Sequence, residues 1–330
     1  GGLASKLIML DMETYDQLFL IKNCFKKALS NPDFNSVYSG LALQSYIPDS
    51  FKIQKELTQW SKQRMEQYHT HPIRIRLVKG ANLEYERIYA ELNGWNCPTY
   101  KNKLEVDAQF KKMLHYAIAD NNLSHVNLGV ATHNLFDLAY AYHLMQAHNV
   151  KQSMTFEMLE GIASPIQEIL IKNKQHVHSY LPIVNNNSFI HALAYLTRRL
   201  DEQLGEGHFL KHYLTLNKNG KEWANLQAQF LESVEHVDKL SHQAMEKQNR
   251  ALKSKFDVNI FKEFKNVPCT NWALVENQDW AKKIKQEYQQ EHDEEIKNYH
   301  LELPKEITGN GRSIKHFFDC SLIVPKKLYT

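Results

Sequence analysis

Residues 125–147 read HVNLGVATHNLFDLAYAYHLMQA. Apolar and β-branched residues fill His125–His133, and an amphipathic helical pattern occupies Phe136–Ala147. The polar pair Thr132 and His133 stands where the expected strand ends. A strand that leads into a helix after a short connection is the βα unit of parallel sheets. This stretch therefore predicts a parallel sheet with helical crossovers.

The same alternation extends from the start of the chain to about Gly205. The expected strands are Lys6–Met12, Val37–Tyr46, Ile73–Gly80, His125–His133, Val150–Leu159 and His178–Val184. The expected helices between them are Tyr15–Leu29, Gln54–Tyr68, Lys103–Ala119, Phe136–Ala147 and Pro165–Lys172. No glycine-rich phosphate motif follows any of these strands, so a Rossmann or P-loop site has no support.

Polar side chains recur where the expected strands end: Asp11, Gln44, Arg76, Lys79, Thr132, His133, Glu157 and Tyr180. In a (β/α)8 barrel the carboxyl ends of the strands converge on the active site. We therefore predict an α/β fold of the TIM-type barrel class, with six of the eight strands present and a helical tail after them. Because the chain starts directly on a strand, we expect a fragment that lacks the first two βα units.

The character of the chain changes after Gly205. Glu222–Arg250 has a long polar helical pattern, Ser254–Trp280 reads as irregular, and Gln286–Asn298 reads as a charged helix. We predict a barrel domain over residues 1–210, a helical linker over 211–260, and the start of a further, truncated domain over 261–330.

The composition excludes several classes of function. Hydrophobic residues make up 43% of the 330 residues, and the formal net charge is only +3. So small a charge gives no support for binding nucleic acid. No apolar run approaches the roughly 18–20 residues that span a bilayer. The four cysteines are far apart and form no CxxC pair, so we expect free thiols in a reducing compartment, the cytoplasm.

One polar stripe is predicted on a helix near the end of the barrel region. Tyr195, Arg198, Arg199 and Glu202 are spaced i, i+3, i+4 and i+7, so they share one helical face. Leucines on other sides of this helix, Leu193 and Leu196 among them, are expected to pack against a core. Two adjacent guanidinium groups under an aromatic ring suit the capture of a small carboxylate. The alternative is a solvated charged face closed by an Arg–Glu pair.

Three readings of the strand ends stay open on the residues alone. Arg76 can direct a positive charge at a flat ligand, which Gly80 would let approach the backbone closely. Asp11, His133 and Glu157 could instead hold a divalent metal in a barrel lyase or isomerase. Alternatively, an incomplete barrel could act only as an interaction module, because its open strand edges invite pairing.

Six motifs in this order carry a family resemblance: LDMETYDQL (10–18), GLALQSY (40–46), RLVKGANLEYE (76–86), VATHN (130–134), FEMLEGIA (156–163) and YLTRRLDE (195–202). They resemble the proline dehydrogenase domain of bacterial bifunctional proline-utilisation flavoenzymes. The tail segment NVPCTNWALVENQDWA (266–281) resembles the entry into the partner aldehyde dehydrogenase domain, which uses NAD and whose catalytic residues are not in this chain. Many relatives carry Tyr-Trp in place of Asn82 and Leu83, so weaker stacking on the cofactor is expected here.

The resemblance implies a (β/α)8 barrel with noncovalent FAD that oxidises L-proline to Δ1-pyrroline-5-carboxylate, on the way to glutamate, and passes electrons to a quinone. It implies that Asp11 supports the substrate pocket by bonding toward Tyr180 and that Arg76 lies near flavin N5, both with catalytic roles. The implied substrate-binding residues are Tyr180, Tyr195, Arg198, Arg199 and Leu159. The implied FAD contacts are Met12, Gln44, Arg76, Val78, Lys79, Gly80, Ala81, Thr132, His133 and Glu202. It further implies a cytoplasmic, homo-oligomeric full-length enzyme that can associate peripherally with the membrane, and no metal.

Overall fold

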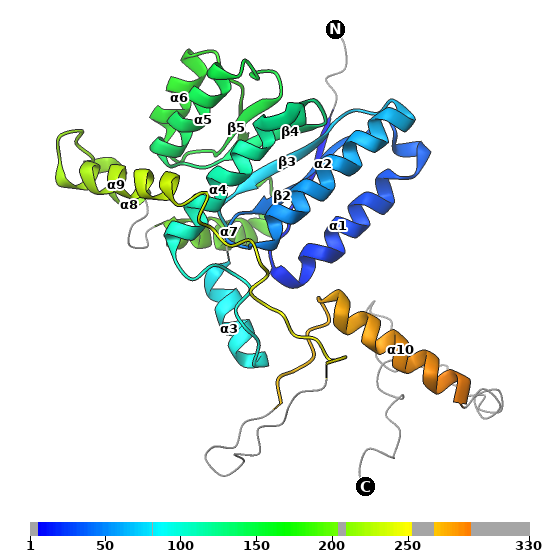
Figure 1. The fold of residues 1–330 in the computed structure, drawn as a ribbon. Helices are drawn as coiled ribbons and strands as arrows, with labels where there is room; N and C mark the ends of the chain where they lie inside the picture. The colour runs from blue at the N-terminus through cyan, green and yellow to red at the C-terminus, as the bar shows by residue number, and fades with distance from the viewer. Residues whose placement is uncertain (1–5, 81, 204–208, 253–266, 292–330) are drawn as a thin grey trace, which may run out of the picture. The chain divides into compact units, whose positions relative to one another are not determined.

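A computed structural model describes residues 6–80, 82–203, 209–252 and 267–291 (Figure 1). Within these ranges the side chains of 198–203, 214 and 291 are left undescribed. The chain divides into one compact unit of residues 1–278 and a second of residues 279–330. Of the second unit, only the C-terminal part of α10 (Val275–Glu291) is described. The domain boundaries expected at 210 and 260 stay a prediction.

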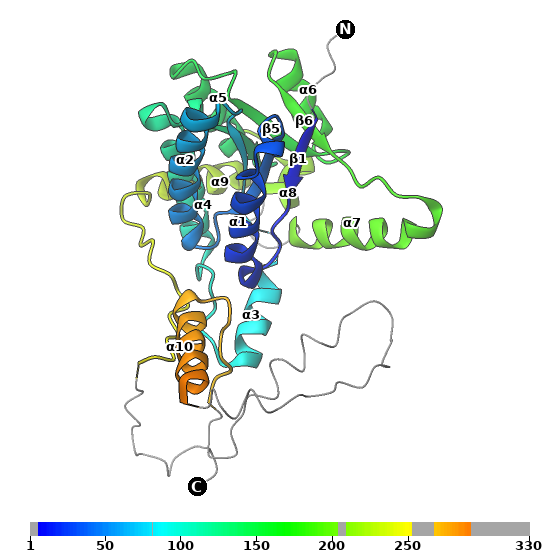
Figure 2. The same ribbon diagram turned by 90° about the vertical axis from the view of Figure 1, so that its right-hand side faces the viewer.

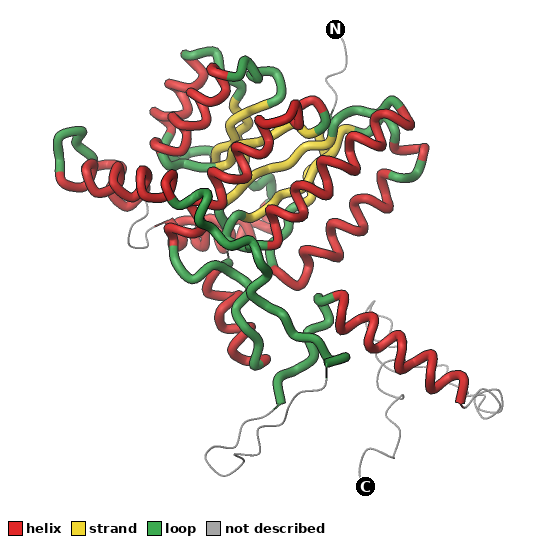
Figure 3. Tube along the Cα trace, in the orientation of Figure 1, coloured by secondary structure: helices red, strands yellow, loops and turns green. Residues whose placement is uncertain are grey.

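Six parallel strands form one sheet, drawn in yellow in Figure 3, in the order β1-β2-β3-β4-β5-β6. Their bounds are β1 Leu7–Leu10, β2 Tyr38–Gln44, β3 Ile73–Val78, β4 Val126–Ala131, β5 Met154–Leu159 and β6 Val177–Tyr180. The register places Arg76 of β3 between Ala42 on β2 and Gly129 on β4. Because every pairing is parallel, all carboxyl ends lie at one edge. The curled half-barrel of six strands confirms the predicted incomplete TIM-type barrel.

The helices follow the strands in the expected alternation. Their bounds are α1 Tyr15–Leu29, α2 Asp49–Tyr68, α3 Leu83–Asn93, α4 Lys103–Ile118, α5 Leu135–Ala147, α6 Ser164–Lys172, α7 Phe189–Gln203, α8 Phe209–His212 and α9 Lys221–Glu235, with short 3-10 turns at Pro32–Phe34, Ala119–Ser124, Asn186–Ser188 and Tyr213–Thr215. Figure 2 shows α1, α2 and α4 on one side of the sheet and α7 on the other.

Two asparagine caps explain why helices start where they do. The Asn134 side chain accepts hydrogen bonds from the backbone N–H groups of Phe136 and Asp137, and Asn102 does the same for Glu105. Such caps satisfy N–H groups that the first helical turn leaves without partners. In α5 the cap follows the end of β4 after two residues, so Thr132 and His133 stay at the strand end.

Alternate residues of the strands separate the core from the site. Leu41 and Leu43 of β2 and Ile75 and Leu77 of β3 are fully buried against the surrounding helices. The intervening residues of β3, Arg74 and Arg76, point to the opposite face, because side chains alternate along a strand. The apolar face therefore holds the helices, and the polar face is left for the interior of the half-barrel.

Two predictions about the tail are wrong. The helix expected over Glu222–Arg250 ends at Glu235, after which Val237 and Leu240 are buried and the chain runs without regular structure to the edge of the described segment. Residues 236–239 form turns instead of helix, and the Val237 carbonyl accepts from Lys112 of α4. The expected irregular stretch up to Trp280 is also wrong in part, since α10 begins at Val275.

The expected packing of α7 is wrong as well. Leu193 is 49% exposed and Leu196 is 39% exposed, and Ala192 is the buried residue among the described side chains of this helix. The helix itself is present over Phe189–Gln203. The main hydrophobic core, formed between the sheet and the other helices, contains none of the described side chains of α7.

Two further observations concern the cysteines and the absence of a membrane-spanning helix in the described ranges. Cys24, Cys97 and Cys269 are free thiols, as expected from their spacing. In the described ranges, we find no helix with the length and apolar character that crossing a membrane requires.

Candidate active site

The polar end of β3 is the centre of a charged cluster at the carboxyl edge of the sheet. Arg76 Nη1 donates to Asp11 Oδ1 at 2.6 Å, and Arg76 Nε donates to Glu157 Oε2. Asp11 follows β1 and Glu157 lies on β5, so the cluster joins strands on both sides of β3. Burial opposes the charge of Arg76, but the carboxylates of Glu157 and Asp11 raise its pKa above the ordinary value. The guanidinium is therefore a fixed positive charge at the strand ends.

Two tyrosine rings extend this cluster. The Arg76 guanidinium carbon lies 5.7 Å from the centroid of the Tyr180 ring, at the end of β6. The centroid of the Tyr195 ring on α7 lies 5.9 Å from that of Tyr180. The structure thus brings together Arg76 and both predicted tyrosines, which lie far apart in the sequence.

The described hydrogen bond of Asp11 comes from Arg76. A bond from Asp11 toward Tyr180 stays a prediction. The same guanidinium lies over the Tyr180 ring. Arg76 therefore contacts both Asp11 and Tyr180.

Four predicted site residues cannot be placed. The side chains of Arg198, Arg199 and Glu202 lie outside the described residues, as does Ala81 entirely. The helix that carries the first three is present from Phe189 to Gln203, so the helical spacing that groups them with Tyr195 holds for the backbone. Their contacts stay predictions.

The end of β2 holds two of the expected cofactor residues together. The Gln44 amide Nε2 donates to the Met12 carbonyl, and both side chains are buried. The other amide atom, Gln44 Oε1, is buried without a hydrogen-bond partner. A buried acceptor left unsatisfied is costly, so Gln44 Oε1 is an acceptor open to a donor at this edge of the sheet.

At the end of β3, Lys79 lies in an ion cluster. Its ammonium is 2.5 Å from Asp107 Oδ1 on α4 and 2.6 Å from Asp137 Oδ2 on α5. Burial lowers the pKa of Lys79, but these two carboxylates raise it well above the usual range. The ammonium stays charged and firmly held. Val78 is half-buried, and its carbonyl accepts from the Ser45 N–H at 2.8 Å.

Gly80 has a φ of 147°, in the region that favours glycine. A Cβ there would lie 2.5 Å from the ring of Tyr46. The glycine is therefore required by the packing of Tyr46, and this explains its presence independently of the close ligand approach that the sequence led us to expect.

His133 and Leu159 are joined at the ends of β4 and β5. The Leu159 backbone N–H donates to His133 Nε2 at 3.0 Å. Burial lowers the pKa of His133 to about 4. The ring is thus neutral near pH 7, with Nε2 as acceptor and its proton on Nδ1. Thr132 Oγ1 accepts from the Asn134 N–H at 3.1 Å, so this hydroxyl also shapes the turn into α5.

Sequence reasoning missed three charged residues that hold the site. Arg74 is 2% exposed and contacts Glu157 from a position two residues before Arg76 on β3. Asp107 and Asp137 hold Lys79. The alternating pattern Ile73-Arg74-Ile75-Arg76 could have revealed Arg74, because residues two apart share a strand face. No signal of that kind marks the two aspartates, which come from separate helices.

The metal alternative finds no support in the geometry. Glu157 is engaged by two arginines, and Asp11 by Arg76. Among the residues that the structure describes, no three His, Cys, Asp or Glu side chains form a group that could hold a metal ion.

A hollow of about 550 Å³ lies elsewhere, between the α3–α4 connection and residues 241–247. None of the strand-end residues lines it. We assign the candidate site to the strand ends, because charged and aromatic groups converge there and the pKa values of Arg76, Glu157 and His133 are shifted.

The parallel six-stranded sheet and its charged carboxyl edge define the class: a domain of the (β/α)-barrel enzymes, with the site where such enzymes place it. The family model described as proline dehydrogenase matches residues 4–212. The chain therefore belongs to the proline dehydrogenase family.

Related proteins agree with this assignment. The solved structure of proline utilization A (PutA) from Corynebacterium freiburgense has a TM-score of 0.70 and 32% identity, over 84% of this chain and 25% of that one. The bifunctional protein PutA of Salmonella typhimurium is 27% identical over 71% of this chain and 17% of its own length. The proline dehydrogenase of Deinococcus radiodurans is 26% identical over 59% of this chain and 53% of its own. The chain thus spans only part of each relative.

Proposed function

We propose that this chain carries the proline dehydrogenase part of a bifunctional enzyme and oxidises L-proline to Δ1-pyrroline-5-carboxylate with FAD. Electrons would pass to a quinone, in the catabolism of proline to glutamate. The observation that carries the proposal is the convergence of Arg76, Asp11 and Glu157 with the rings of Tyr180 and Tyr195 at the carboxyl edge of the sheet. Family membership gives this convergence its chemical meaning.

The residues present fit a flavin. Gln44 offers a buried acceptor without a partner, His133 offers a neutral ring with a proton on Nδ1, and Lys79 and Arg76 offer fixed positive charge. These are the donors, acceptors and cations that an electron-poor ring system with a diphosphate requires. When bound, FAD would accept the hydride from the substrate carbon. Met12, Val78, Gly80, Ala81, Thr132 and Glu202 are the further proposed contacts.

The residues of the chain would bind and orient the substrate. Arg198 and Arg199 are proposed to hold the proline carboxylate as a bidentate clamp, which fixes the ring without a covalent step. Tyr180 and Tyr195 would flank that ring, and Leu159 would pack against it. Arg76, held by Asp11 and Glu157, would supply positive charge beside the reacting atoms. No general base beyond the tuning of the site is needed if proline binds with a neutral amine.

The setting of the activity belongs to the same proposal. We infer a cytoplasmic, homo-oligomeric enzyme that associates peripherally with the membrane to reach its quinone. NAD would serve only an aldehyde dehydrogenase domain, whose beginning we place in residues 261–330. The domain division at 1–210 and 211–260 is part of this proposal.

The test is a comparison of two arginine variants in the FAD-loaded protein. Wild type should reduce an electron-accepting dye only when proline is present, and a ring-shaped carboxylate analogue should inhibit it. Arg76→Met should lower kcat/KM about 100-fold, the order found when one such charge-stabilising donor is lost. Arg87→Met, which removes an exposed arginine of α3 paired with Glu84, should leave the rate unchanged. A wild-type protein with no proline-dependent dye reduction would refute the proposal.

A further inference from the structure

Two arginines of β3 share one carboxylate on the inner face of the sheet. Glu157 Oε1 accepts from Arg74 Nε at 3.0 Å and from Arg74 Nη2 at 2.7 Å, while Glu157 Oε2 accepts from Arg76 Nε. Each carboxylate oxygen thus serves a different guanidinium. Since the carboxylate is planar, fixing one oxygen fixes the direction of the other.

The bridge from β3 to β5 crosses β4, and only a very small residue there leaves room for it. Strands lie about 4.8 Å apart, so the bridge spans roughly 10 Å. A Cβ added at Gly129 of β4 would lie 2.0 Å from Glu157 Oε1 and 3.0 Å from Arg74 Nη2. On the other flank, a Cβ at Gly40 would lie 2.2 Å from the Arg74 carbonyl oxygen. Gly129 therefore makes the arginine–carboxylate bridge possible, whereas Gly40 leaves room for the backbone of Arg74 itself.

The bridge is buried and its charges are matched. Arg74 is 2% exposed and Glu157 is 6% exposed. Burial raises the pKa of Glu157, but the guanidiniums of Arg76 and Arg74 together lower it below its usual value. Arg74 is anchored further by Thr155 Oγ1 and lies 3.4 Å from His178 Nδ1.

His178 completes the set of titratable neighbours. Burial and the charge of Arg74 lower its pKa, so the ring is neutral and can accept from the guanidinium. The charged or titratable groups facing Glu157 are Arg74 and Arg76 of β3 and His178 of β6, with Asp11 and Tyr180 beyond Arg76.

We propose that Arg74 is a positioning residue for Arg76: it fixes the orientation of the shared Glu157 carboxylate, and so holds Arg76 toward the strand ends. Arg74 does not itself reach those ends. The effect of Arg74 on catalysis rests on the proposed function. Its role in orienting Glu157 and Arg76 does not depend on that function.

Hydrogen exchange at the Arg76 side chain tests the structural role directly. In the full chain with isotope-labelled arginine, the Arg76 Nε–H signal should be protected from exchange down to acid pH. In Arg74→Met, the pH at which protection is lost should rise by about one unit or more, because Glu157 loses one of its two cations. Arg74→Lys, which restores the charge, should bring that pH back toward the wild-type value.

The matched control is Arg64→Met. Arg64 is an equally buried arginine of α2, but its guanidinium donates to the backbone carbonyls of Leu29 and Phe34. This variant should leave the Arg76 signal unchanged. If folded Arg74→Met shows the wild-type acid limit, the positioning role is overturned.

Gly129→Ala provides a second route should Arg74→Met fail to fold. It removes no charge but displaces the Glu157 carboxylate, so Arg76 Nε–H should exchange rapidly even at neutral pH. Retained protection in this variant would also overturn the proposal.

A catalytic arm separates this inference from the proposed function. In the FAD-loaded chain, Arg74→Met should shift the acid limb of the proline-dependent rate upward by the same amount as the exchange limit, with unchanged flavin content. A wild type that does not oxidise proline would refute the function, whereas the exchange measurement would still decide the role of Arg74.

Discussion

Single charged residues at strand ends organise this molecule. Arg76 is held by the carboxylates of Asp11, which follows β1, and of Glu157 on β5, and those contacts fix its charge as well as its direction. Lys79 is held in the same manner by Asp107 and Asp137. In both cases a cation is desolvated and then compensated, which gives a rigid charge rather than a mobile surface one.

His133 gives a pH-dependent prediction at this scale. Its folded pKa of about 4 lies below the roughly 6.5 of an unfolded histidine, so the folded state takes up this proton less readily. Stability is therefore full above about pH 6.5 and falls as the pH drops toward 4, by about 2 kcal/mol between pH 7 and 5. Urea unfolding at both pH values should show that loss in wild type and much less of it in His133→Gln.

The control for His133 is an exposed histidine. His143→Gln, on the outer side of α5, should retain the wild-type dependence on pH. Equal dependence in wild type and His133→Gln would contradict the assignment of a buried, neutral ring.

The sequence predicted the strand-end residues well and their supports poorly. Asp11, Arg76, Glu157 and Tyr180 were expected together, because carboxyl ends of parallel strands meet at one edge, and they do meet. The hydrogen bond from Arg76 to Asp11 was not predictable, since it depends on side-chain directions between strands. Asp107 and Asp137 carry no strand-end position, so nothing in the one-dimensional pattern marked them as partners of Lys79.

At the scale of elements, helices are tied to the site by a few buried polar contacts. The backbone N–H of Tyr15, at the start of α1, donates to Glu86 Oε1 on α3 at 2.7 Å. This bond joins the segment that follows Asp11 and Met12 to the helix that follows Gly80. The loops after β1 and β3 are therefore coupled through their helices.

Glu86 makes that coupling sensitive to pH. Burial raises its pKa to about 7, against the lowering effect of the Tyr15 N–H, whereas an unfolded glutamate titrates near 4.3. The stabilising contribution is full below about pH 4.3 and is lost as the pH rises through 7. Wild type should lose about 2.5 kcal/mol of unfolding free energy between pH 5 and 8, and Glu86→Gln should not.

Thermal or urea unfolding measured at both pH values checks this. Glu84→Gln, at an exposed position on the same helix, is the control and should behave as wild type. A Glu86→Gln variant that still loses stability between pH 5 and 8 would show that the dependence comes from another group.

The bounds of helices were predicted correctly where the apolar periodicity was strong. They were predicted wrongly where tertiary contacts of single residues determine where the helix ends. Tyr15–Leu29 was predicted with its observed bounds. In the tail, the polar pattern of Glu222–Arg250 continues past Glu235, but Val237 and Leu240 are buried and Glu246 accepts from the Asn96 N–H. These tertiary contacts override helix propensity, which is a weak signal.

At the scale of the whole sheet, β1 and β6 are the two edges. Neither pairs with a further strand on its outer side in the described part of the chain. Ile8 of β1 is 56% exposed and Leu10 is 38% exposed. Unpaired edges with apolar side chains favour pairing with another chain.

We therefore expect self-association of the 330-residue chain that rises with concentration. Ile8→Lys should reduce it, because a charge at an edge strand disfavours pairing. Leu20→Lys, an equally exposed apolar position on α1, is the control and should have no effect. Analytical ultracentrifugation over a concentration series measures this, and identical association in Ile8→Lys and wild type would exclude β1 as the contact.

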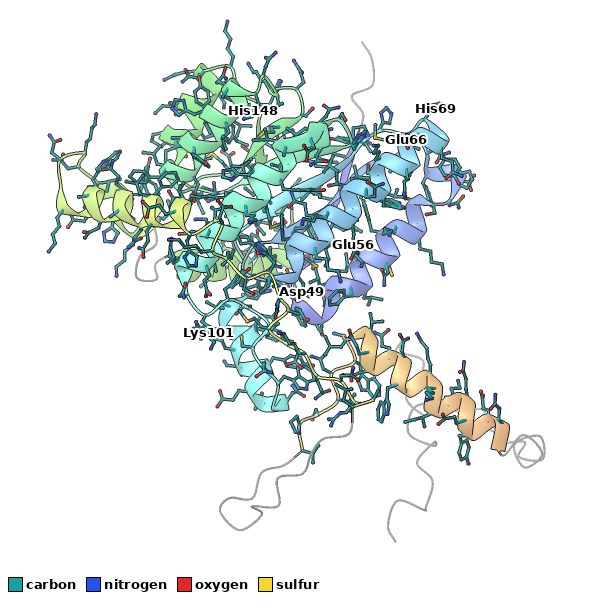
Figure 4. The ribbon with its side chains drawn as sticks, viewed as in Figure 1. Asp49, Glu56, Glu66, His69, Lys101 and His148 are labelled. Atoms are coloured by element: carbon teal, nitrogen blue, oxygen red, sulfur yellow. The ribbon has the colours of Figure 1, made fainter. Side chains whose placement is uncertain are left out.

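An ion pair between α1 and α2 offers a further control for the variants proposed here. Glu56, on α2 beside α1 (Figure 4), pairs with Lys22 at 2.8 Å. A pair of this partly exposed kind contributes little to stability. Glu56→Gln should therefore leave folding and ligand binding as in wild type, which sets the background for changes at Glu157.

The most direct test of the account is the visible spectrum of the FAD-loaded protein on anaerobic addition of L-proline. If the strand-end cluster holds a flavin against an imino acid, the oxidised flavin absorbance should bleach with proline, and the response should be strongly weakened in Arg76→Met. A flavin-loaded wild type whose spectrum is unchanged by proline would contradict the central claim.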